Sequence, residues 1–257
     1  MAKRRIKDRR TIIVRLYTLL AVLALSIVFG GAAYGVWQSE VRVDSISVSG
    51  ADILLPQTIG ENVERSIAGT YAYIFPKDSI FLISENYIRE NLTDTYPRIK
   101  EVSVSRLDFR SIEVSISERV GVFMWCASAT STTCIASDSD GFLFARADMD
   151  LVPVYGSLLA DAPEIRNTIF EEGAIPKVSA LINALSNFGE EVVQILFRGD
   201  DEVVLNFASG PRLEYVLGEE EYVGQAFPSV LESIEEFSEI EYLDMRFGKR
   251  VYIKRNE

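Results

Sequence analysis

One uncharged stretch near the N-terminus limits what the rest of the chain can be. Residues 16–37 read LYTLLAVLALSIVFGGAAYGVW, 22 residues without a charged side chain. As an α-helix this run would be about 33 Å long, against about 30 Å for the hydrocarbon core of a bilayer. Tyr34 and Trp37 lie where an interfacial aromatic anchor belongs. The sequence therefore predicts one membrane-spanning helix over residues 16–37.

Charge sets the expected orientation of this helix. Residues 1–15 hold seven Lys or Arg against Asp8, a net charge of +6, which leaves −18 for the other 242 residues of a chain whose total is −12. Basic residues before a span favour the cytoplasmic side. We therefore expect a basic cytoplasmic tail over 1–15 and an exported body after Trp37. So acidic a body is not expected to bind nucleic acid, because phosphate contacts need a basic surface.

A cleaved signal peptide is the alternative reading of the N-terminus. Residues 16–29 are short enough for its apolar region, and GGAAYG over 30–35 offers small residues for cleavage. The uncharged run continues to Trp37, which favours an uncleaved anchor. Both readings export the rest of the chain.

The two cysteines, Cys126 and Cys134, flank a short polar stretch between two apolar runs. In an oxidising compartment we expect a disulfide across this hairpin, contributing about 2–3 kcal/mol; two free thiols are the alternative. A zinc site would lack ligands, because the chain has two cysteines and no histidine.

The sequence contains few combinations of residues that could support catalysis. Without histidine there is no Ser-His-Asp or Cys-His nucleophile, and no phosphate-binding or dinucleotide glycine pattern is present. Carboxylate-pair chemistry remains, but runs such as Glu190-Glu191 and Glu219-Glu220-Glu221 are typical of solvated helix ends and loops. We expect no enzyme, no cofactor, no metal and no small-molecule substrate.

Residues 43–118 read as a small α+β domain. Apolar and polar residues alternate in three stretches, and apolar residues recur at helical spacing in two others, with Ser84 as an N-cap before the second helix. The expected elements are a strand over 43–50, helices over 56–68 and 84–96, and strands over 101–107 and 111–117. This order, βααββ, predicts a three-stranded sheet with both helices on one side.

Residues 119–257 are expected to form a mainly antiparallel β-domain with helices on one face. One helix is expected over 176–189, and a second over about 222–237, where Pro228 predicts a kink or a late start. The strand-like runs are 192–199, 202–208 and 212–218, followed by a final hairpin.

The order and spacing of elements over 43–118 resemble a POTRA domain, a module named for polypeptide-transport association. The next residues, SISERVGVFMW over 115–125, resemble the exit from the POTRA domain in the FtsQ/DivIB family of bacterial cell-division proteins. That family has Glu-Arg, here Glu118 and Arg119, then a small residue or proline and an apolar strand with Trp125. Gly121 stands where proline is common, a minor departure.

The resemblance continues to the C-terminus. Asp140-Gly141 is a strong turn signal, LVPVYG over 151–156 resembles the family's Pro-x-x-Gly step, and 243–250 resembles its closing signature. The resemblance implies a single-pass (type II) scaffold of the bacterial divisome in the inner membrane at the septum. Its implied partners are membrane-anchored division proteins of the FtsB/FtsL or DivIC kind.

The chain ends on a basic strand with one unpaired edge. Protection of that edge by charge is one reading of Lys249, Arg250, Lys254 and Arg255. The other is β-augmentation, in which an acidic partner segment adds a strand. In that reading Asp244, Arg246 and Phe247 place the penultimate strand. The pairing edge then comprises Arg250, Val251, Tyr252 and Ile253.

A proline at Tyr252 is expected to abolish partner binding in a folded domain, provided that its N–H points outward. Two other functions are also compatible with the sequence. One is a POTRA protein for polypeptide export or outer-membrane assembly. The other is a membrane-tethered carboxylate enzyme acting on peptidoglycan.

Overall fold

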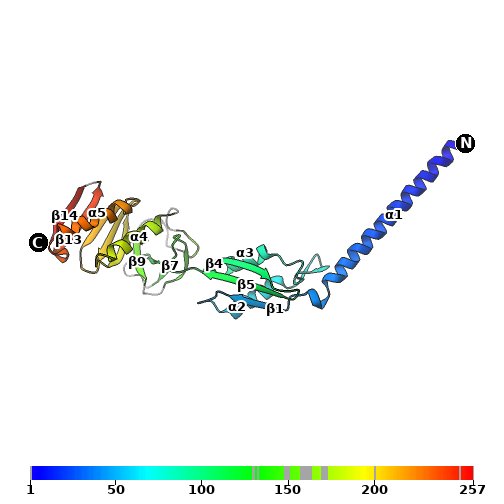
Figure 1. Cartoon of the computed structure of the whole chain (residues 1–257), viewed down its shortest axis with the longest axis horizontal. Coiled ribbons are helices and arrows are strands. Elements are labelled where there is room, and N and C mark those ends of the chain that lie inside the picture. Colours follow the sequence, from blue (N-terminus) through cyan, green and yellow to red (C-terminus); the bar gives the residue numbers. More distant parts are fainter. Residues whose placement is uncertain are drawn as a thin grey trace. The chain divides into compact units, whose positions relative to one another are not determined.

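The computed structural model describes residues 2–128, 131, 133–147, 151–156, 164–168, 173–199, 201–248 and 250–256, with side chains from residue 12 onward. The chain divides into two compact units, Met1–Glu118 and Arg119–Glu257 (Figure 1). Each unit has its own sheet and its own hydrophobic core.

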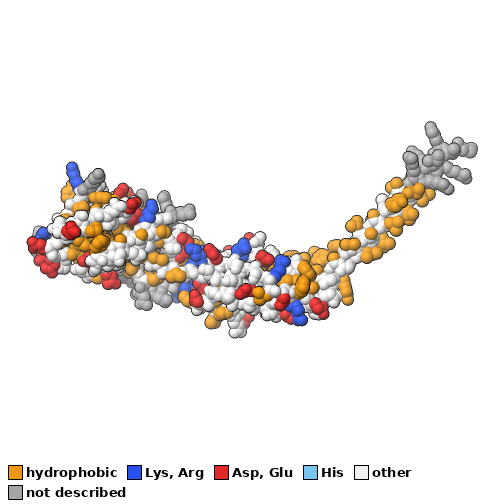
Figure 2. Space-filling model, viewed as in Figure 1, with side chains coloured by type: hydrophobic (Ala, Val, Ile, Leu, Met, Phe, Trp, Pro, Cys, Tyr) orange, Lys and Arg blue, Asp and Glu red, His pale blue; other side chains and the backbone are white. Residues whose placement is uncertain are grey.

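The first element, α1 (Ala2–Val36), is one helix that includes both the basic tail and the apolar run. The helix continues through the basic segment because Lys and Arg are good helix formers and no Gly or Pro interrupts them. Among the described residues one segment, Ile12–Val36, is long and apolar enough to cross a membrane, and none of it is buried. Figure 2 shows hydrophobic side chains along this length.

The rest of the first unit is a three-stranded sheet covered by two helices. A short 3-10 helix (Ser39–Val41) leads into the sheet, whose order is β1-β5-β4, with β1 parallel and β4 antiparallel to β5. The elements are β1 (Ser45–Ser49), α2 (Pro56–Ile67), the hairpin β2 (Thr70–Tyr71) and β3 (Phe75–Pro76), α3 (Glu85–Thr95), β4 (Ile99–Arg106) and β5 (Ser111–Glu118).

The period of the apolar residues explains this packing. Ile112, Val114 and Ile116 alternate along β5 and are buried on one face, whereas the intervening residues are polar. The helices α2 and α3 pack on that face and on each other. The Ser84 hydroxyl accepts the Tyr87 N–H at 3.3 Å, so the expected N-cap of α3 is confirmed.

Glu118 joins the end of β5 to the loop between β1 and α2. Its carboxylate oxygen Oε1 accepts the backbone N–H groups of Asp52, Ile53 and Leu54 at 2.9, 3.0 and 2.9 Å. Three donors on one charged acceptor form strong hydrogen bonds. The Glu of the Glu-Arg pair is thus a structural residue of the first unit.

The second unit is built on a nine-stranded sheet in the order β14-β13-β12-β11-β10-β9-β6-β7-β8. The sheet is mixed, because β6 with β9, β9 with β10, and β12 with β13 run parallel. The elements are β6 (Phe123–Cys126), β7 (Cys134–Ser137), β8 (Leu143–Arg146), β9 (Val152–Gly156), α4 (Ala174–Ser186), β10 (Val192–Arg198), β11 (Glu202–Phe207), β12 (Arg212–Val216), α5 (Glu220–Glu232), a 3-10 helix (Phe237–Glu239), β13 (Ile240–Phe247) and β14 (Arg250–Arg255).

The main core of this unit lies between the sheet and the pair α4 and α5. Trp125, Leu185 and Phe227 are among its buried side chains. A smaller cluster holds Met124 and the disulfide between Cys126 and Cys134. Met124 and Cys126 alternate with Trp125 along β6, so the disulfide lies on the face of the sheet opposite the helices.

Two expectations for α5 were wrong, namely a late start near Pro228 and an end near residue 237. The helix spans Glu220–Glu232, so Pro228 lies inside it and Phe237 belongs to the following 3-10 helix. The helix continues through Pro228, because the loss of one backbone N–H donor does not outweigh the packing of α5 against the core. Glu220, expected in a solvated run, is 4% exposed and accepts the Gly218 N–H at 2.9 Å. A carboxylate in the first turn is favoured by the helix dipole.

Gly50 follows β1 at a point where its backbone closely approaches the backbone of β5. This close approach gives a first prediction. Its φ is +76°, and a Cβ there would lie 2.1 Å from the Ile116 carbonyl oxygen. Gly69 has φ +91° with no atom within 4 Å of such a Cβ. We expect Gly69→Ala to lower the free energy of unfolding by about 1–2 kcal/mol from backbone strain alone. Gly50→Ala should cost at least about 2 kcal/mol more, because the added methyl meets fixed backbone.

The measurement is hydrogen exchange of the β5 amides in the full chain, which reports the free energy of opening of the first unit. Equal losses in the two variants would contradict the close approach at Gly50.

Candidate functional site

The last strand, β14, forms one end of the nine-stranded sheet. Among the described residues it pairs with β13 alone, antiparallel, with Leu243 opposite Ile253 and Asp244 opposite Tyr252. Figure 1 shows β14 at the border of the sheet. A strand in this position presents a row of unpaired N–H and C=O groups to any incoming chain.

The direction of each N–H on β14 follows from its pairing. Asn256 donates its N–H to the Glu239 carbonyl at 2.8 Å, toward β13. The register shifts in this pair insert extra residues on β13 and leave β14 regular. Since N–H direction alternates along a strand, Tyr252 and Lys254 direct their N–H groups toward β13. Val251, Ile253 and Arg255 direct theirs outward.

This geometry corrects one expectation. A proline at Tyr252 would remove a donor that faces β13, so it would damage the sheet itself. A proline removes an outward donor at Val251, Ile253 or Arg255, and Ile253 is the middle one of these three. The sequence could not settle this point, because N–H direction depends on register and not on residue type.

Side chains at the edge differ between the two faces. On the helix face Val251 packs against the core and Ile253 remains 40% exposed. On the other face the rings of Tyr252 and Phe247 make an edge contact with centroids 5.6 Å apart, and both are about half exposed. Apolar side chains therefore border the unpaired backbone on both sides, where an added strand would cover them.

Asp244 and Arg246 form the ionic centre of the neighbouring strand. The Arg246 guanidinium donates to Asp244 at 2.9 and 2.7 Å and to Glu202 at 2.7 Å, and it lies 3.2 Å from Glu214. These carboxylates come from β13, β11 and β12. One side chain thus ties three strands together on the face away from the helices. The hydrogen bond from Arg246 holds the pKa of Asp244 below its usual value.

Arginines surround the carboxylates of this cluster. Besides Arg246, Arg212 donates to the buried Glu214 at 3.0 Å, and Arg198 lies 3.4 Å from it. A general acid in a glycosidase needs a raised pKa, whereas the partners of Asp244 lower its pKa. The arrangement supports a structural role, because it fixes β13 and with it the register of β14.

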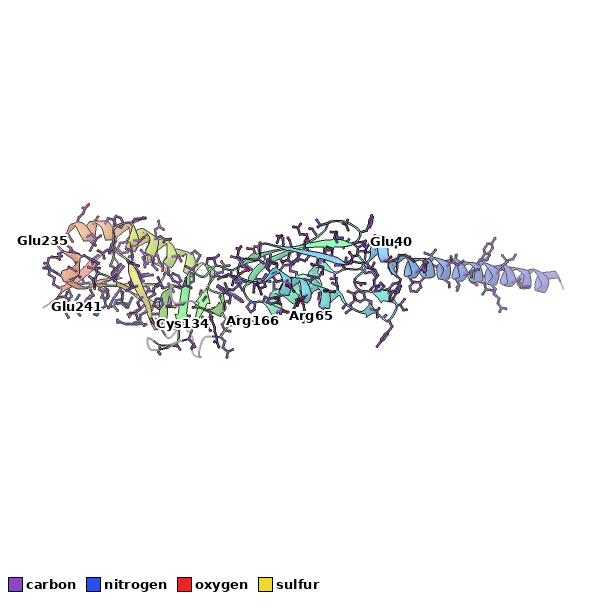
Figure 3. All side chains as sticks on the ribbon, turned by 90° about the horizontal axis from the view of Figure 1, so that it is seen from below. Glu40, Arg65, Cys134, Arg166, Glu235 and Glu241 are labelled. Atoms are coloured by element: carbon purple, nitrogen blue, oxygen red, sulfur yellow. A yellow bond between two sulfur atoms is a disulfide. The ribbon has the colours of Figure 1, made fainter. Side chains whose placement is uncertain are left out.

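The basic character of β14 is partly neutralised by its own domain. Lys254 forms an ion pair with Glu241 at 2.6 Å, and this hydrogen bond raises the pKa of Lys254 (Glu241 is labelled in Figure 3). Arg250 and Arg255 are exposed, and Lys249 lies outside the described residues. Among the described basic residues of β14, the two arginines are therefore exposed, whereas Lys254 is paired within its own domain.

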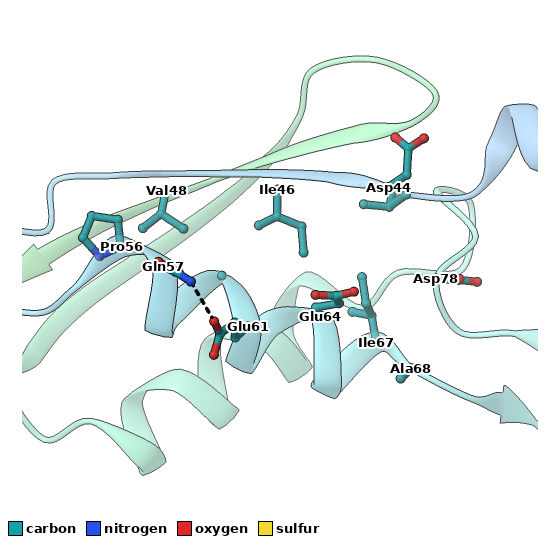
Figure 4. A pocket seen from close by; sticks show the side chains of 12 residues that line it. Asp44, Ile46, Val48, Pro56, Gln57, Glu61, Glu64, Ile67, Ala68 and Asp78 are labelled. Carbon is teal, nitrogen blue, oxygen red and sulfur yellow. Dashed lines mark hydrogen bonds between the residues drawn. The ribbon is translucent and has the colours of Figure 1, made fainter.

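A second sheet edge is present in the first unit. In the described part of that unit β1 pairs only with β5. A groove of about 490 Å³ runs between β1 and α2. Figure 4 shows Ile46 and Val48 on its strand side and Glu61 and Glu64 on its helix side. This edge is acidic, whereas the edge at β14 carries exposed arginines.

Sequence reasoning missed the role of Arg119. Its guanidinium pairs with the buried Asp138 and lies over the Phe142 ring, 4.1 Å from the centroid. Asp138 also accepts the N–H groups of Asp140 and Phe142 at 2.9 and 3.0 Å. The Glu-Arg pair thus holds a loop on each side of the boundary between the units. The Glu-Arg motif marked Arg119 in the sequence but did not indicate its pairing with Asp138.

The Arg246 cluster gives a second prediction. Arg246→Gln leaves Asp244 and Glu214 buried with fewer cations, which should lower the free energy of unfolding at pH 7 by about 3 kcal/mol. A carboxyl whose pKa is lower in the folded state stabilises above its unfolded pKa of about 3.9 and loses this contribution as pH falls through the folded value. The deficit of the variant should therefore shrink below about pH 4.

Chemical unfolding of the full chain at pH 7 and pH 3, followed by the fluorescence of buried Trp125, measures this deficit. Exposed Arg250→Gln is the matched control and should change stability by less than about 0.5 kcal/mol. A deficit that is the same at both pH values would exclude the ionic explanation.

The comparisons with known proteins concern mainly the first unit. A family model described as the POTRA domain of the FtsQ type matches residues 41–119. No curated protein matches the chain. The matched range contains all three strands and both helices of the βααββ unit, and it follows the apolar part of α1. The chain thus carries an FtsQ-type POTRA domain behind an N-terminal apolar helix, an arrangement that fits an FtsQ/DivIB-like protein.

Proposed function

We propose that this protein is a single-pass scaffold of bacterial cell division that acts by binding other division proteins and not by catalysis. The FtsQ-type POTRA domain supports a division-related role. In this proposal α1 crosses the inner membrane with the basic tail in the cytoplasm, and both folded units work outside it at the division septum. The observation that carries the binding mechanism is the one-sided pairing of β14.

The proposed contact is strand addition at β14. An incoming strand would accept hydrogen bonds from the outward N–H groups of Val251, Ile253 and Arg255, and donate to carbonyls of the same edge. Its side chains would cover Ile253 on one face and Tyr252 on the other. Acidic residues in the partner are favoured beside the exposed Arg250 and Arg255.

The partners we propose are membrane-anchored division proteins of the FtsB/FtsL or DivIC kind. The edge of β1 offers a second contact surface, and its acidic groove suits a basic segment. The two edges thus differ in charge, which would let one scaffold bind a different partner at each edge. An export role is less well supported, because the family model that matches is of the FtsQ type.

A pair of proline variants tests strand addition. Ile253→Pro removes an outward N–H, so it should weaken binding of an FtsB/FtsL-like or DivIC-like protein from the same cell about tenfold or more. Its thermal unfolding should stay close to that of the native chain. Tyr252→Pro removes a donor to β13 and should lower the unfolding temperature. Ile253→Thr keeps both the N–H and the β-branched shape and is the control.

The affinity is measured with both proteins reconstituted in lipid nanodiscs. If Ile253→Pro is folded and binds as the native chain does, the partner does not pair with this edge.

Cellular location tests the division role separately. A fluorescent protein fused ahead of the basic tail should give a band at mid-cell in dividing cells, because the proposed partners assemble there. A chain truncated after Gly248 lacks β14 and is expected to stay in the envelope but lose the band. An even envelope signal from the full chain would refute the septal role.

A further inference from the structure

The end of the POTRA domain that follows α1 carries an unusual hairpin. Between β2 and β3, Ala72 and Tyr73 both have positive φ, +48° and +61°. Bulky residues rarely adopt this conformation, and such strain concentrates at functional positions. Tyr73 is 97% exposed and Ile74 is 44% exposed. The fold thus holds an aromatic ring away from the domain at the tip of a strained turn.

This hairpin is attached to α1. The Trp37 indole donates its N–H to the Ile74 carbonyl at 2.7 Å. The rings of Phe29 and Phe75 meet edge to face with centroids 5.6 Å apart. Phe29 precedes the end of α1 at Val36 by about 10 Å of helix. The hairpin therefore lies beside the last turns of the segment that is apolar enough to cross a membrane.

A second apolar group lies at the same end of the domain. The exposed fractions of Phe81, Leu107 and Phe109 are 57%, 58% and 64%, and the two phenylalanine rings are 6.3 Å apart. The Asp44 N–H, just before β1, donates to the Arg110 carbonyl at 3.0 Å. The turn that carries Leu107 and Phe109 is therefore at the end where the chain arrives from α1.

Cations accompany these rings. Lys77 lies over the Tyr71 ring at 5.4 Å, and Arg42 lies over the Trp37 ring at 5.7 Å. Aromatic rings with a polar end, flanked by Lys or Arg, are typical of the boundary between headgroups and acyl chains. Figure 2 shows hydrophobic side chains both on α1 and where it meets the domain.

We propose that the POTRA domain rests on the bilayer, with the hairpin tip (Tyr71, Tyr73, Ile74) and the group Phe81, Leu107 and Phe109 inserted into the outer headgroup region. The occupant is lipid because the hairpin contacts α1, whose apolar length is itself exposed, and the second group lies at the same end of the domain. The inference rests on the membrane anchor of the proposed function. It adds that the first folded unit is held against the membrane and not on a free tether.

Site-directed spin labelling of the full chain tests the contact. Tyr73→Cys is labelled with a nitroxide in vesicles of phosphatidylethanolamine and phosphatidylglycerol; the native cysteines form a disulfide and do not react. The control is Ile53→Cys, 66% exposed and apolar but held by Glu118 at the other end of β5. The strand β5 is eight residues long, so its two ends are about 23 Å apart.

Accessibility of each label to oxygen, which enters lipid, is compared with accessibility to a water-soluble nickel chelate. We expect the oxygen-to-nickel ratio at residue 73 to be at least about threefold higher than at residue 53. Phe109→Cys is a second site, independent of the strained turn, and should behave like residue 73.

Three outcomes would overturn the proposal or its foundation. A ratio at residues 73 and 109 equal to that at 53 places them in water and refutes the lipid contact. Low accessibility to both reagents means that protein covers the surface, which also refutes it. Release of the chain from vesicles by alkaline carbonate refutes the anchor, and with it the proposed function.

Discussion

A strand at the end of a sheet can satisfy only half of its backbone hydrogen bonds within its own molecule, and β14 is such a strand. Its pairing with β13 leaves three N–H groups directed outward, one on every second residue: Val251, Ile253 and Arg255. The core and the Arg246 cluster of the second unit hold β13, and with it β14, in one register. A partner that pairs with the edge gains main-chain hydrogen bonds without any change in the fold, so recognition and sheet formation become the same interaction.

Two sets of contacts keep β14 in place. On the helix face the apolar core extends to Val251, and on the opposite face Arg246 ties Asp244, Glu202 and Glu214 together across three strands. A slip of β13 by one residue would turn Asp244 and Arg246 into the core and expose Leu243 and Met245, both of which are buried. The ionic cluster therefore fixes the strand on which the proposed binding edge depends, and its own residues lie outside that edge.

Much of this architecture could be predicted from the sequence, because it depends on periodicity. The alternation in β5, the Ser84 cap and the closing hairpin are local signals, and they led to the correct elements. What the sequence could not provide depends on register or tertiary contact. The direction of the Tyr252 N–H depends on pairing with β13, the burial of Glu220 on the packing of α5, and the three bonds of Glu118 on a loop 64 or more residues away.

Residue-resolved hydrogen exchange of the β14 amides tests the central claim most directly. In the chain alone, the amides of Val251, Ile253 and Arg255 should exchange far faster than those of Tyr252 and Lys254, which face β13. On binding an FtsB/FtsL-like or DivIC-like partner, the first three should become protected, with the second two little changed. Protection of all five amides in the chain alone, or no gain at the three outward amides on binding, would contradict the account.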